Sequence, residues 1–392
     1  MRFVIVGGGI AGITAAMDLV RRNLGTVEVY TDEEYPYYYR PQLTEFLAGT
    51  ITMNELLRRP LSWYQDRGID IHLGQYVTAI HPEEKSITVN GETTVAYDKL
   101  LLALGSLPSN PPIKGIDKPG VLTWRTLEDT LEMEKAAATC HDTIIIGGGL
   151  LGLEASRGLR NFCSRIKVLE YFPRLMPRQL DSQGARLLQE HVESTGVEVI
   201  VNAHTQEITG DERVTGVHLE RGLDLPAQTI ICAAGVRSNT KIAKEAGIDV
   251  NRGIIVDDQM TTNHPDIYAA GDVAEYKGYC WAIAPIAQTQ ARIASSNMAG
   301  ENTAYDTVVP STTLKVVGID VSSIGRVNPE SDEFVEIRNL DREAETYKKI
   351  VLHNGQIVGA ILINAKPMAR GIENKISARE SMTIEEAKSL IA

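Results

Sequence analysis

The sequence predicts an α/β protein made of two similar strand–turn–helix units and a smaller α+β domain at the end of the chain. Three observations predict it: a glycine-rich stretch occurs twice, an apolar closing strand occurs twice, and the pattern changes to alternating strands near residue 307. With about 100 to 200 residues expected per domain, 392 residues have room for two or three domains.

The repeat consists of residues 4–12, VIVGGGIAG, and the similar residues 144–152, IIIGGGLLG. In both copies a β-branched run typical of a buried parallel strand leads directly into a pattern of helical period. In the first unit we expect Gly25 to end the helix and a strand to follow at 27–30; in the second we expect a helix at 152–159 and a strand at 166–169. The inward positions of the first helix are Ile13, Ala16, Met17 and Val20.

Each unit also has its own closing strand, at 100–106 and at 229–235, which ends in small residues. The proline-rich stretch 107–120 predicts an extended linker between the units. Further on, 313–323 alternates like one strand, and the turn Asn354-Gly355 between two apolar runs predicts a hairpin. These last elements predict the small α+β domain.

The glycines have a definite physical use. In a G-x-G-x-x-G turn the first glycine makes the turn, the second lets the backbone approach a pyrophosphate, and the third lets the helix pack on the sheet. Both units are therefore predicted to be Rossmann-like dinucleotide-binding domains; two tight turns without ligands are the alternative. The glycines of this pattern are Gly7, Gly9 and Gly12 in the first unit and Gly147, Gly149 and Gly152 in the second.

Acidic residues near these turns are candidate ligands of ribose. Glu170 ends the strand after the second turn, where a carboxylate repels the 2′-phosphate of NADP and favours NADH, although Arg174 lies nearby. In the first unit we favour Glu33 within the acidic run 32–34, which could also be a solvated turn. Asp272, after the strand-like 266–270, could hold a ribityl hydroxyl of FAD or cap a helix that begins at Ala274.

Composition excludes several classes of protein. A net charge of −12 and a pI near 5.3 disfavour nucleic acid and anionic membranes as partners. The chain begins directly with a strand-like segment and contains no apolar run of about 20 residues, so we expect a cytoplasmic, soluble protein. The spacing of Cys140, Cys163, Cys232 and Cys280 matches no metal site or vicinal disulfide, and we expect buried thiols and no metal.

Taken together, the two glycine-rich units, Ala269-Ala270-Gly271-Asp272 and Ala233-Ala234-Gly235 resemble the FAD-dependent pyridine nucleotide-disulfide oxidoreductase superfamily over essentially the whole chain. Within it, residues 38–43, YYRPQL, and 314–325, LKVVGIDVSSIG, resemble NADH:rubredoxin reductases and the FAD domain of NADH-dependent nitrite reductases. The resemblance implies a discontinuous FAD-binding domain at 1–108 and 229–306, an NAD(H)-binding domain at 109–228 and an α+β domain at 307–392.

The resemblance also implies the site residues. Arg40 and Pro41 would lie against the flavin, Asp272 would bind its ribityl chain, and Glu154, otherwise an ordinary acid on a helix face, would lie near the nicotinamide carboxamide. The full FAD set is Gly7, Gly9, Ala11, Gly12, Glu33, Arg40, Pro41, Thr78, Ala79, Ala103, Gly105, Gly271, Asp272 and Pro285. The NAD set is Gly147, Gly149, Leu151, Gly152, Glu154, Glu170 and Gly235.

The sequence departs from some relatives in its cysteines. Disulfide reductases of this superfamily have a cysteine pair beside the flavin, and the coenzyme A-disulfide reductases and NADH peroxidases have one cysteine near 40–43; this chain has neither. Because a thiolate is the nucleophile of that chemistry, these activities are disfavoured. Leu104 also replaces the threonine usual in the first closing turn.

We therefore expect hydride transfer from NADH to FAD and onward electron transfer, without a catalytic side chain, to a carrier such as rubredoxin. The protein would act as a monomer or homodimer. Alternatives are an NADH-oxidising subunit of a larger nitrite reductase-like or oxoacid:acceptor complex, and a flavin- or nucleotide-binding regulator without turnover. Candidate docking cations are Arg58, Arg59, Lys366, Arg370, Lys375 and Arg379. We favour the alternative that they are ordinary solvated faces partnered by Glu373 and Glu380.

Overall fold

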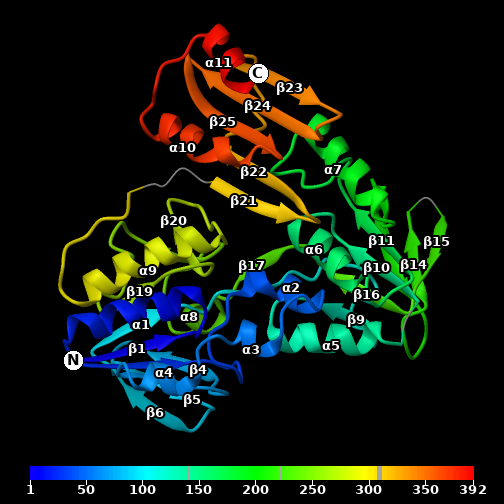
Figure 1. The fold of residues 1–392 in the computed structure, drawn as a ribbon. Coiled ribbons are helices and arrows are strands. Elements are labelled where there is room, and N and C mark those ends of the chain that lie inside the picture. The colour runs from blue at the N-terminus through cyan, green and yellow to red at the C-terminus, as the bar shows by residue number, and fades with distance from the viewer. Residues whose placement is uncertain (140, 221, 307–310) are drawn as a thin grey trace. The chain divides into compact units, whose positions relative to one another are not determined.

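The structure is a computed structural model that describes the whole chain except residues 140, 221 and 307–310 (Figure 1). Its contacts divide the chain into two units. The first consists of Met1–Gln42, Ile51–Leu107 and Val236–Val308, and the second of Leu43–Thr50, Pro108–Gly235 and Val309–Ala392. Both units are therefore assembled from separated stretches of chain.

The first unit is built on a five-stranded parallel sheet in the order β19-β7-β1-β2-β3. Its central strands are almost wholly apolar and buried, as expected for a parallel sheet covered on both faces. Helix α1 (Ile10–Arg22) follows β1, and α9 (Ala284–Met298) packs against α1. The strands are β1 (Arg2–Val6), β2 (Thr26–Tyr30), β3 (Ile69–His72), β7 (Lys99–Leu102) and β19 (Ile267–Ala269).

Smaller elements complete this unit. An antiparallel sheet is formed by β4 (Val77–His81), β5 (Ser86–Val89) and β6 (Thr93–Ala96). Two strand pairs are β18 (Ile254–Val256) with β20 (Ala274–Tyr276), and β8 (Ser106–Pro108) with β17 (Val236–Ser238). The short helices are η1 (Arg40–Gln42), α3 (Met53–Leu56), α4 (Leu61–Gln65) and α8 (Lys241–Glu245).

The second unit repeats the parallel sheet, in the order β12-β11-β10-β16-β9. The strands are β9 (Val121–Thr123), β10 (Asp142–Ile146), β11 (Arg165–Glu170), β12 (Glu198–Val201) and β16 (Thr229–Cys232). The helices are α2 (Leu43–Leu47), α5 (Leu127–Ala137), α6 (Leu150–Leu159) and α7 (Ser182–Ser194). A three-stranded sheet is formed by β13 (Thr205–Thr209), β14 (Gly216–Leu219) and β15 (Leu223–Pro226).

The last part of the second unit is an antiparallel sheet in the order β21-β22-β25-β24-β23, with helices beside it (Figure 1). The strands are β21 (Ser311–Val316), β22 (Ile319–Gly325), β23 (Phe334–Asp341), β24 (Thr346–His353) and β25 (Gln356–Ile363). The helices are η2 (Lys366–Met368), α10 (Ala369–Ser377) and α11 (Ile384–Ile391). The predicted fold class, two Rossmann-like domains and a small α+β domain, is confirmed.

Several local predictions can be compared with these elements. Both closing strands are confirmed, because β7 pairs with β1 and β16 pairs with β10. The domain boundary expected at 229 places β16 with the first domain, whereas β16 belongs to the second sheet and the crossover lies after Gly235. The first helix ends at a left-handed Asn23, φ 53°, before the expected Gly25.

The single strand expected at 313–323 is wrong, because the structure has two strands there. Val317 and Gly318 form a turn with φ of 49° and 97° between β21 and β22. A β-branched residue is disfavoured at positive φ, so a valine at position 317 does not indicate a turn. By contrast, the predicted hairpin at Asn354-Gly355, φ 50° and 72°, joins β24 to β25 and is confirmed.

Among the described residues, the structure contains no helix with the combined length and apolarity that a membrane span requires.

Candidate functional site

The first glycine turn lies between β1 and α1 and is tightly packed on two of its three glycines. Gly7 has φ 114°, and a Cβ built on it would lie 2.1 Å from the carbonyl oxygen of Ala103 in the closing turn. A Cβ on Gly12 would lie 1.9 Å from the carbonyl oxygen of Gly7. A Cβ on Gly9 meets no atom within 4 Å. The middle of the turn is thus bare backbone that faces open space.

The second turn, between β10 and α6, has the same packing. Gly147 has φ 117° and approaches the Ala233 carbonyl oxygen, at 2.5 Å from a built Cβ, while Gly152 would meet Gly147 at 1.9 Å. Gly149 again faces open space. Helices α1 and α6 both begin at these open glycines without a side-chain cap, so their first N–H groups remain for an anion. Both turns therefore fit the pyrophosphate of a dinucleotide.

Glu170 ends β11 beside the second turn and is 5% exposed. Its carboxylate accepts hydrogen bonds from the N–H groups of Gly148, at 2.7 Å, and Phe172, at 2.8 Å. Arg174, which raised the possibility of a 2′-phosphate site, donates instead to the carbonyl oxygens of Pro177 and Leu180, both at 3.1 Å. Its guanidinium is therefore engaged by its own loop.

Glu33 lies beside the first turn, in a small hollow. Its carboxylate accepts a hydrogen bond of 2.5 Å from the Tyr38 hydroxyl and pairs with Arg40. Thr31, however, is the residue packed against Gly8, as Glu170 is against Gly148. The hollow is lined by Gly8, Gly9, Thr31, Glu33, Tyr35, Tyr37, Tyr38 and Arg40. The tyrosines of this wall were missed from the sequence, although 35–39 contains four of them.

Gly271 and Asp272 follow β19 and lie against the helix of the first turn. A Cβ on Gly271, φ 86°, would lie 3.0 Å from Ala11 of α1. The Asp272 carboxylate accepts a 2.9 Å hydrogen bond from the Ser106 hydroxyl, and the Ser238 hydroxyl donates to the Asp272 carbonyl oxygen. Asp272 does not cap a helix, because Ala274 begins strand β20.

Other predicted residues of the first unit lie on several elements. Pro285 stands in the first turn of α9, and Pro41 lies in η1 directly after Arg40. Thr78 and Ala79 lie on β4, where the Thr78 hydroxyl is bonded to Thr88 and Gly91 of its own sheet rather than to the glycine turn. Gly105, φ 65°, directly precedes Ser106, whose role was missed from the sequence.

Glu154 on α6 is 7% exposed and is not an ordinary acid on a solvated helix face. Its carboxylate accepts a 3.0 Å hydrogen bond from the N–H of Val317 and lies 3.5 Å from Arg157. Burial raises the pKa of the Glu154 carboxyl above its ordinary value, and the Val317 N–H and Arg157 oppose this shift. Leu151 lies in the first turn of α6, and Gly235, φ 106°, follows β16.

Three of the cysteines lie in the described part of the chain. Cys163 and Cys232 are buried, as expected for small apolar side chains, and Cys280 is half-buried. Burial raises the pKa of the Cys232 thiol and of the Cys280 thiol, which disfavours the reactive thiolate. Cys140 lies outside the described residues.

The candidate docking cations are already partnered in part. Arg58 donates to the Glu55 carbonyl oxygen, and Arg59 lies 4.6 Å over the Trp63 ring. Lys375 pairs with Glu380 at 2.5 Å, and Glu373 accepts a hydrogen bond from Ser311. Lys366, Arg370 and Arg379 are exposed.

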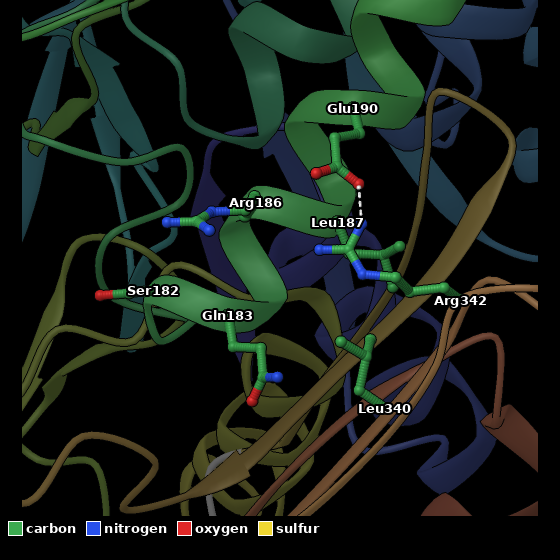
Figure 2. A pocket seen from close by; sticks show the side chains of 7 residues that line it. All are labelled: Ser182, Gln183, Arg186, Leu187, Glu190, Leu340 and Arg342. Atoms are coloured by element: carbon green, nitrogen blue, oxygen red, sulfur yellow. Dashed lines mark hydrogen bonds and ion pairs between the residues drawn. The ribbon is translucent and has the colours of Figure 1, made fainter.

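The second unit has a further cavity of about 280 Å³ between α7 and β23 (Figure 2). Figure 2 shows Arg342 reaching Glu190, 3.2 Å apart, while Arg186 points away from that pair. Its lining residues, none of which was predicted to be in a site, are Ser182, Gln183, Arg186, Leu187, Glu190, Leu340 and Arg342.

Two α/β units with matching glycine turns, each beside an acidic residue, define the class of proteins that bind two dinucleotides on separate domains. The pyridine nucleotide-disulphide oxidoreductase family model matches residues 1–319, and the model of the rubredoxin NAD+ reductase C-terminal domain matches residues 310–380. The chain belongs to the pyridine nucleotide-disulphide oxidoreductase family, as its resemblance implied.

Three similar proteins illustrate the range of relatives. The nitrite reductase [NAD(P)H] of Bacillus subtilis is 38% identical over 92% of this chain and 45% of its own length. The NADH-rubredoxin oxidoreductase of Clostridium acetobutylicum is 28% identical over 97% of this chain and 95% of its own. A crystal structure of NADH:rubredoxin oxidoreductase from Clostridium acetobutylicum superposes with a TM-score of 0.80 at 27% identity, covering 97% of this chain and 96% of that one. The chain spans about half the length of the nitrite reductase relative.

Proposed function

We propose that the protein is an FAD-dependent NADH oxidoreductase that passes electrons to an external redox protein of the rubredoxin kind. The observation that carries the proposal is the pair of glycine turns with open middle glycines, one beside Glu33 and one beside Glu170. When bound, FAD supplies the chemistry that accepts two electrons as hydride from NADH and releases them one at a time.

In this proposal the first unit holds FAD. The N–H groups at the start of α1 bind the pyrophosphate, and Glu33, oriented by Tyr38 and Arg40, accepts the ribose hydroxyls. Asp272, oriented by Ser106, accepts a ribityl hydroxyl. Arg40 and Pro41 would lie against the flavin. The remaining proposed contacts are Ala11, Thr78, Ala79, Ala103, Gly105, Gly271 and Pro285.

The second unit would hold NADH. Two backbone N–H groups hold the Glu170 carboxylate in place, where it would accept the adenosine ribose hydroxyls. Its negative charge would repel a 2′-phosphate. Glu154 would accept from the nicotinamide carboxamide, with Val317 holding one of its oxygens. Leu151 and Gly235 would line the same site.

A protein acceptor is supported by the last domain and by the cysteines. Residues 310–380 match the C-terminal domain of rubredoxin NAD+ reductases, and the proposed route contains no thiol pair. The thiols of Cys232 and Cys280 suit a reducing compartment, and we propose a cytoplasmic location. The protein would be a monomer or homodimer.

A second candidate function is the NADH-oxidising part of a larger complex, such as a nitrite reductase or an oxoacid:acceptor oxidoreductase. It is favoured by the 38% identity to a nitrite reductase of which this chain spans 45%. Purification of the native protein with metal-cluster subunits would support it. A flavin- or nucleotide-binding regulator without turnover is the third candidate.

Anaerobic reduction distinguishes these functions. NADH added to the FAD-loaded protein should bleach the flavin absorbance rapidly, NADPH much more slowly, and rubredoxin should restore the absorbance faster than ferredoxin, oxygen, nitrite or a disulfide. Failure of NADH to bleach the flavin would leave the regulator as the remaining candidate. Rapid reduction by NADPH would contradict the role of Glu170.

A further inference from the structure

The turn between β21 and β22 contains a valine in a backbone conformation that valine disfavours. Val317 has φ 49°, and among the described residues it is the only β-branched residue with positive φ. A two-residue turn of this kind suits Asn-Gly, because both positions need positive φ and a β-branched residue there strains the backbone. Such strain persists only where the surrounding contacts fix the backbone, and it is concentrated at functional sites.

The backbone of Val317 is fixed by side chains from two helices. Its N–H donates to the Glu154 carboxylate on α6 at 3.0 Å, and its carbonyl oxygen lies 3.1 Å from Nε2 of His191 on α7. Because a carbonyl oxygen only accepts hydrogen bonds, the Nε2 of His191 is the donor. The Val317 side chain is 6% exposed, and all of these residues belong to the second unit. The turn is thus held from α6 and from α7 at the same residue.

The ring of His191 is oriented on its other side as well. Its Nδ1 lies 3.6 Å from the carboxylate of Glu345, in the turn between β23 and β24. The imidazole is therefore placed between a carboxylate and a backbone carbonyl oxygen. The contacts form a continuous series from Glu345 through His191 and Val317 to Glu154.

The last contact of the series determines how the Glu154 carboxylate is oriented. The Oε1 atom accepts the Val317 N–H, and the Oε2 atom lies 3.5 Å from Arg157. A carboxylate held at one oxygen cannot rotate freely about its last side-chain bond, so the direction of the second oxygen is set. A binding group is effective only when supporting contacts keep it in place in this way.

We propose that the Val317–Gly318 turn, held by His191, is a positioning element that fixes the Glu154 carboxylate for the carboxamide of nicotinamide. The inference rests on the proposed function, in which Glu154 accepts from that carboxamide. His191 is then a positioning residue, because it acts on Glu154 through the backbone of Val317. The strained valine has a role in this arrangement, since its turn presents an N–H to α6 and a carbonyl oxygen to α7 together.

The test uses the FAD-loaded protein and calorimetric titration with NAD+ and with ADP-ribose, which lacks the nicotinamide; neither reduces the flavin. His191→Ala should raise the Kd of NAD+ about fivefold and leave the Kd of ADP-ribose unchanged, because only the nicotinamide end loses a fixed partner. His191→Gln, whose amide N–H can still donate to the Val317 carbonyl oxygen, should bind both like the wild type. His218→Ala, which removes another histidine of the second unit that is paired with an acid, is the matched control and should also bind both normally.

A second variant tests whether His191 acts through Glu154. Glu154→Leu should raise the Kd of NAD+ about tenfold, the loss of one hydrogen bond to a charged group. His191→Ala added to Glu154→Leu should change that Kd by less than about twofold, because two substitutions in one series of contacts are not additive. Retained FAD and an unchanged Kd of ADP-ribose show that each variant is folded.

The outcomes separate this inference from the proposed function. Equal weakening of NAD+ and ADP-ribose in His191→Ala overturns the inference, because the histidine would then support the whole unit. An unchanged Kd of NAD+ in His191→Ala, beside a raised one in Glu154→Leu, overturns the inference and leaves the proposed function intact. An unchanged Kd of NAD+ in Glu154→Leu rejects both the inference and the placement of Glu154 at the nicotinamide. The expected Kd values in a protein that NADH does not reduce support the positioning element and reject the proposed reaction.

Discussion

A methyl group on Gly9 or Gly149 meets no atom of the described residues within 4 Å, whereas one on Gly12 or Gly152 would lie 1.9 Å from a carbonyl oxygen. The third glycine is therefore needed for the fold, whereas the packing leaves the middle position free, and we propose that the middle glycine is needed for the nucleotide. This difference can be measured separately in each unit.

We predict that Gly9→Ala changes the free energy of unfolding of the FAD-free protein by less than about 1 kcal/mol, because both residues suit its extended backbone. Its FAD affinity should fall about tenfold or more, equivalent to at least about 1.4 kcal/mol. Gly149→Ala should retain FAD and lose affinity for NAD+ instead. Calorimetric titration with each nucleotide measures both effects, and Gly12→Ala, which should not fold stably, is the contrasting variant. Equal loss of both nucleotides in one middle-glycine variant would contradict the assignment.

Glu154 predicts a pH-dependent stability. Because burial raises its pKa in the folded protein, its protonated form is favoured there, and the associated stability is present below the ordinary value of 4.5 and lost as pH rises through the folded pKa. Gln is neutral throughout, so Glu154→Gln should gain about 1 kcal/mol relative to the wild type at pH 8 and little at pH 4. Urea unfolding at both pH values measures this. A gain that is the same at pH 4 and pH 8 would show that the carboxyl is not perturbed.

At the scale of single residues, the sequence predicted the candidate site residues that are marked by their spacing from a strand. The glycines, Glu170 and Asp272 are recognisable because each stands at a strand end with a fixed spacing. Two partners of these acids were missed because they are distant in sequence: Ser106 is 166 residues from Asp272, and Val317 is 163 residues from Glu154. Tyr38 is only 5 residues from Glu33, but no periodic pattern in this irregular segment indicates that the two side chains meet.

At the scale of elements, α7 is joined to the last sheet by a buried ionic cluster. Lys349 on β24 is 1% exposed, and its Nζ lies 2.8 Å from Glu336 and 3.2 Å from Asp181. Asp181 also caps α7 by accepting the Gly184 N–H. Burial alone would raise the pKa of Asp181, but Gly184, Tyr347 and Lys349 together hold it below its ordinary value.

We predict that Lys349→Met destabilises the protein by about 3 kcal/mol. The substitution removes the buried cation from two partly buried carboxylates, Asp181 and Glu336, and leaves the half-exposed Arg338 as their remaining cationic partner. The loss should shrink as pH falls through the folded pKa of Asp181, since the protonated acid no longer needs a partner. Urea unfolding at pH 7 and pH 3 measures it. Lys388→Met, in an exposed pair with Glu385, is the control and should change stability by less than about 0.5 kcal/mol. A loss of that small size in Lys349→Met would mean that the cluster contributes little.

Elements with a regular period were predictable and irregular joints were not. The strands and helices after both turns follow from β-branched runs and helical spacing. The β21–β22 turn was missed because valine at positive φ gives no turn signal, and the position after Asp272 could be interpreted as a helix start until its pairing partner β18 was known.

At the scale of the whole molecule, the repeat predicted two units, but the sequence could not place the crossover. Strand β16 is as apolar as β7 and could close either sheet, and only its pairing with β10 assigns it. Contacts also group α2 with the second unit, although both of its neighbours in sequence belong to the first.

The proposed electron transfer from NADH through FAD to the acceptor uses no cysteine, and this predicts the behaviour of a cysteine-free protein. A variant with alanine at all four cysteine positions should oxidise NADH with rubredoxin at a rate within about twofold of the wild type, since no cysteine is placed in the route. Its stability should fall by a few kcal/mol at most, from the small cavities at Cys163 and Cys232. Stopped-flow reduction and steady-state rates measure the first claim. A tenfold lower rate in a folded, FAD-loaded variant would show that a cysteine thiol takes part in electron transfer.

The two glycine turns pack alike at their first and third glycines. Gly8 packs against Thr31, and Gly148 packs against Leu175 and Glu170, while the contacts of the first and third glycines are matched between the turns. The three glycines of each turn therefore do not determine which nucleotide a unit accepts. We predict that exchanging the residues just past β2 and β11 between the two units changes the nucleotide preference of the unit that receives them, as measured by calorimetric titration with FAD and NAD+.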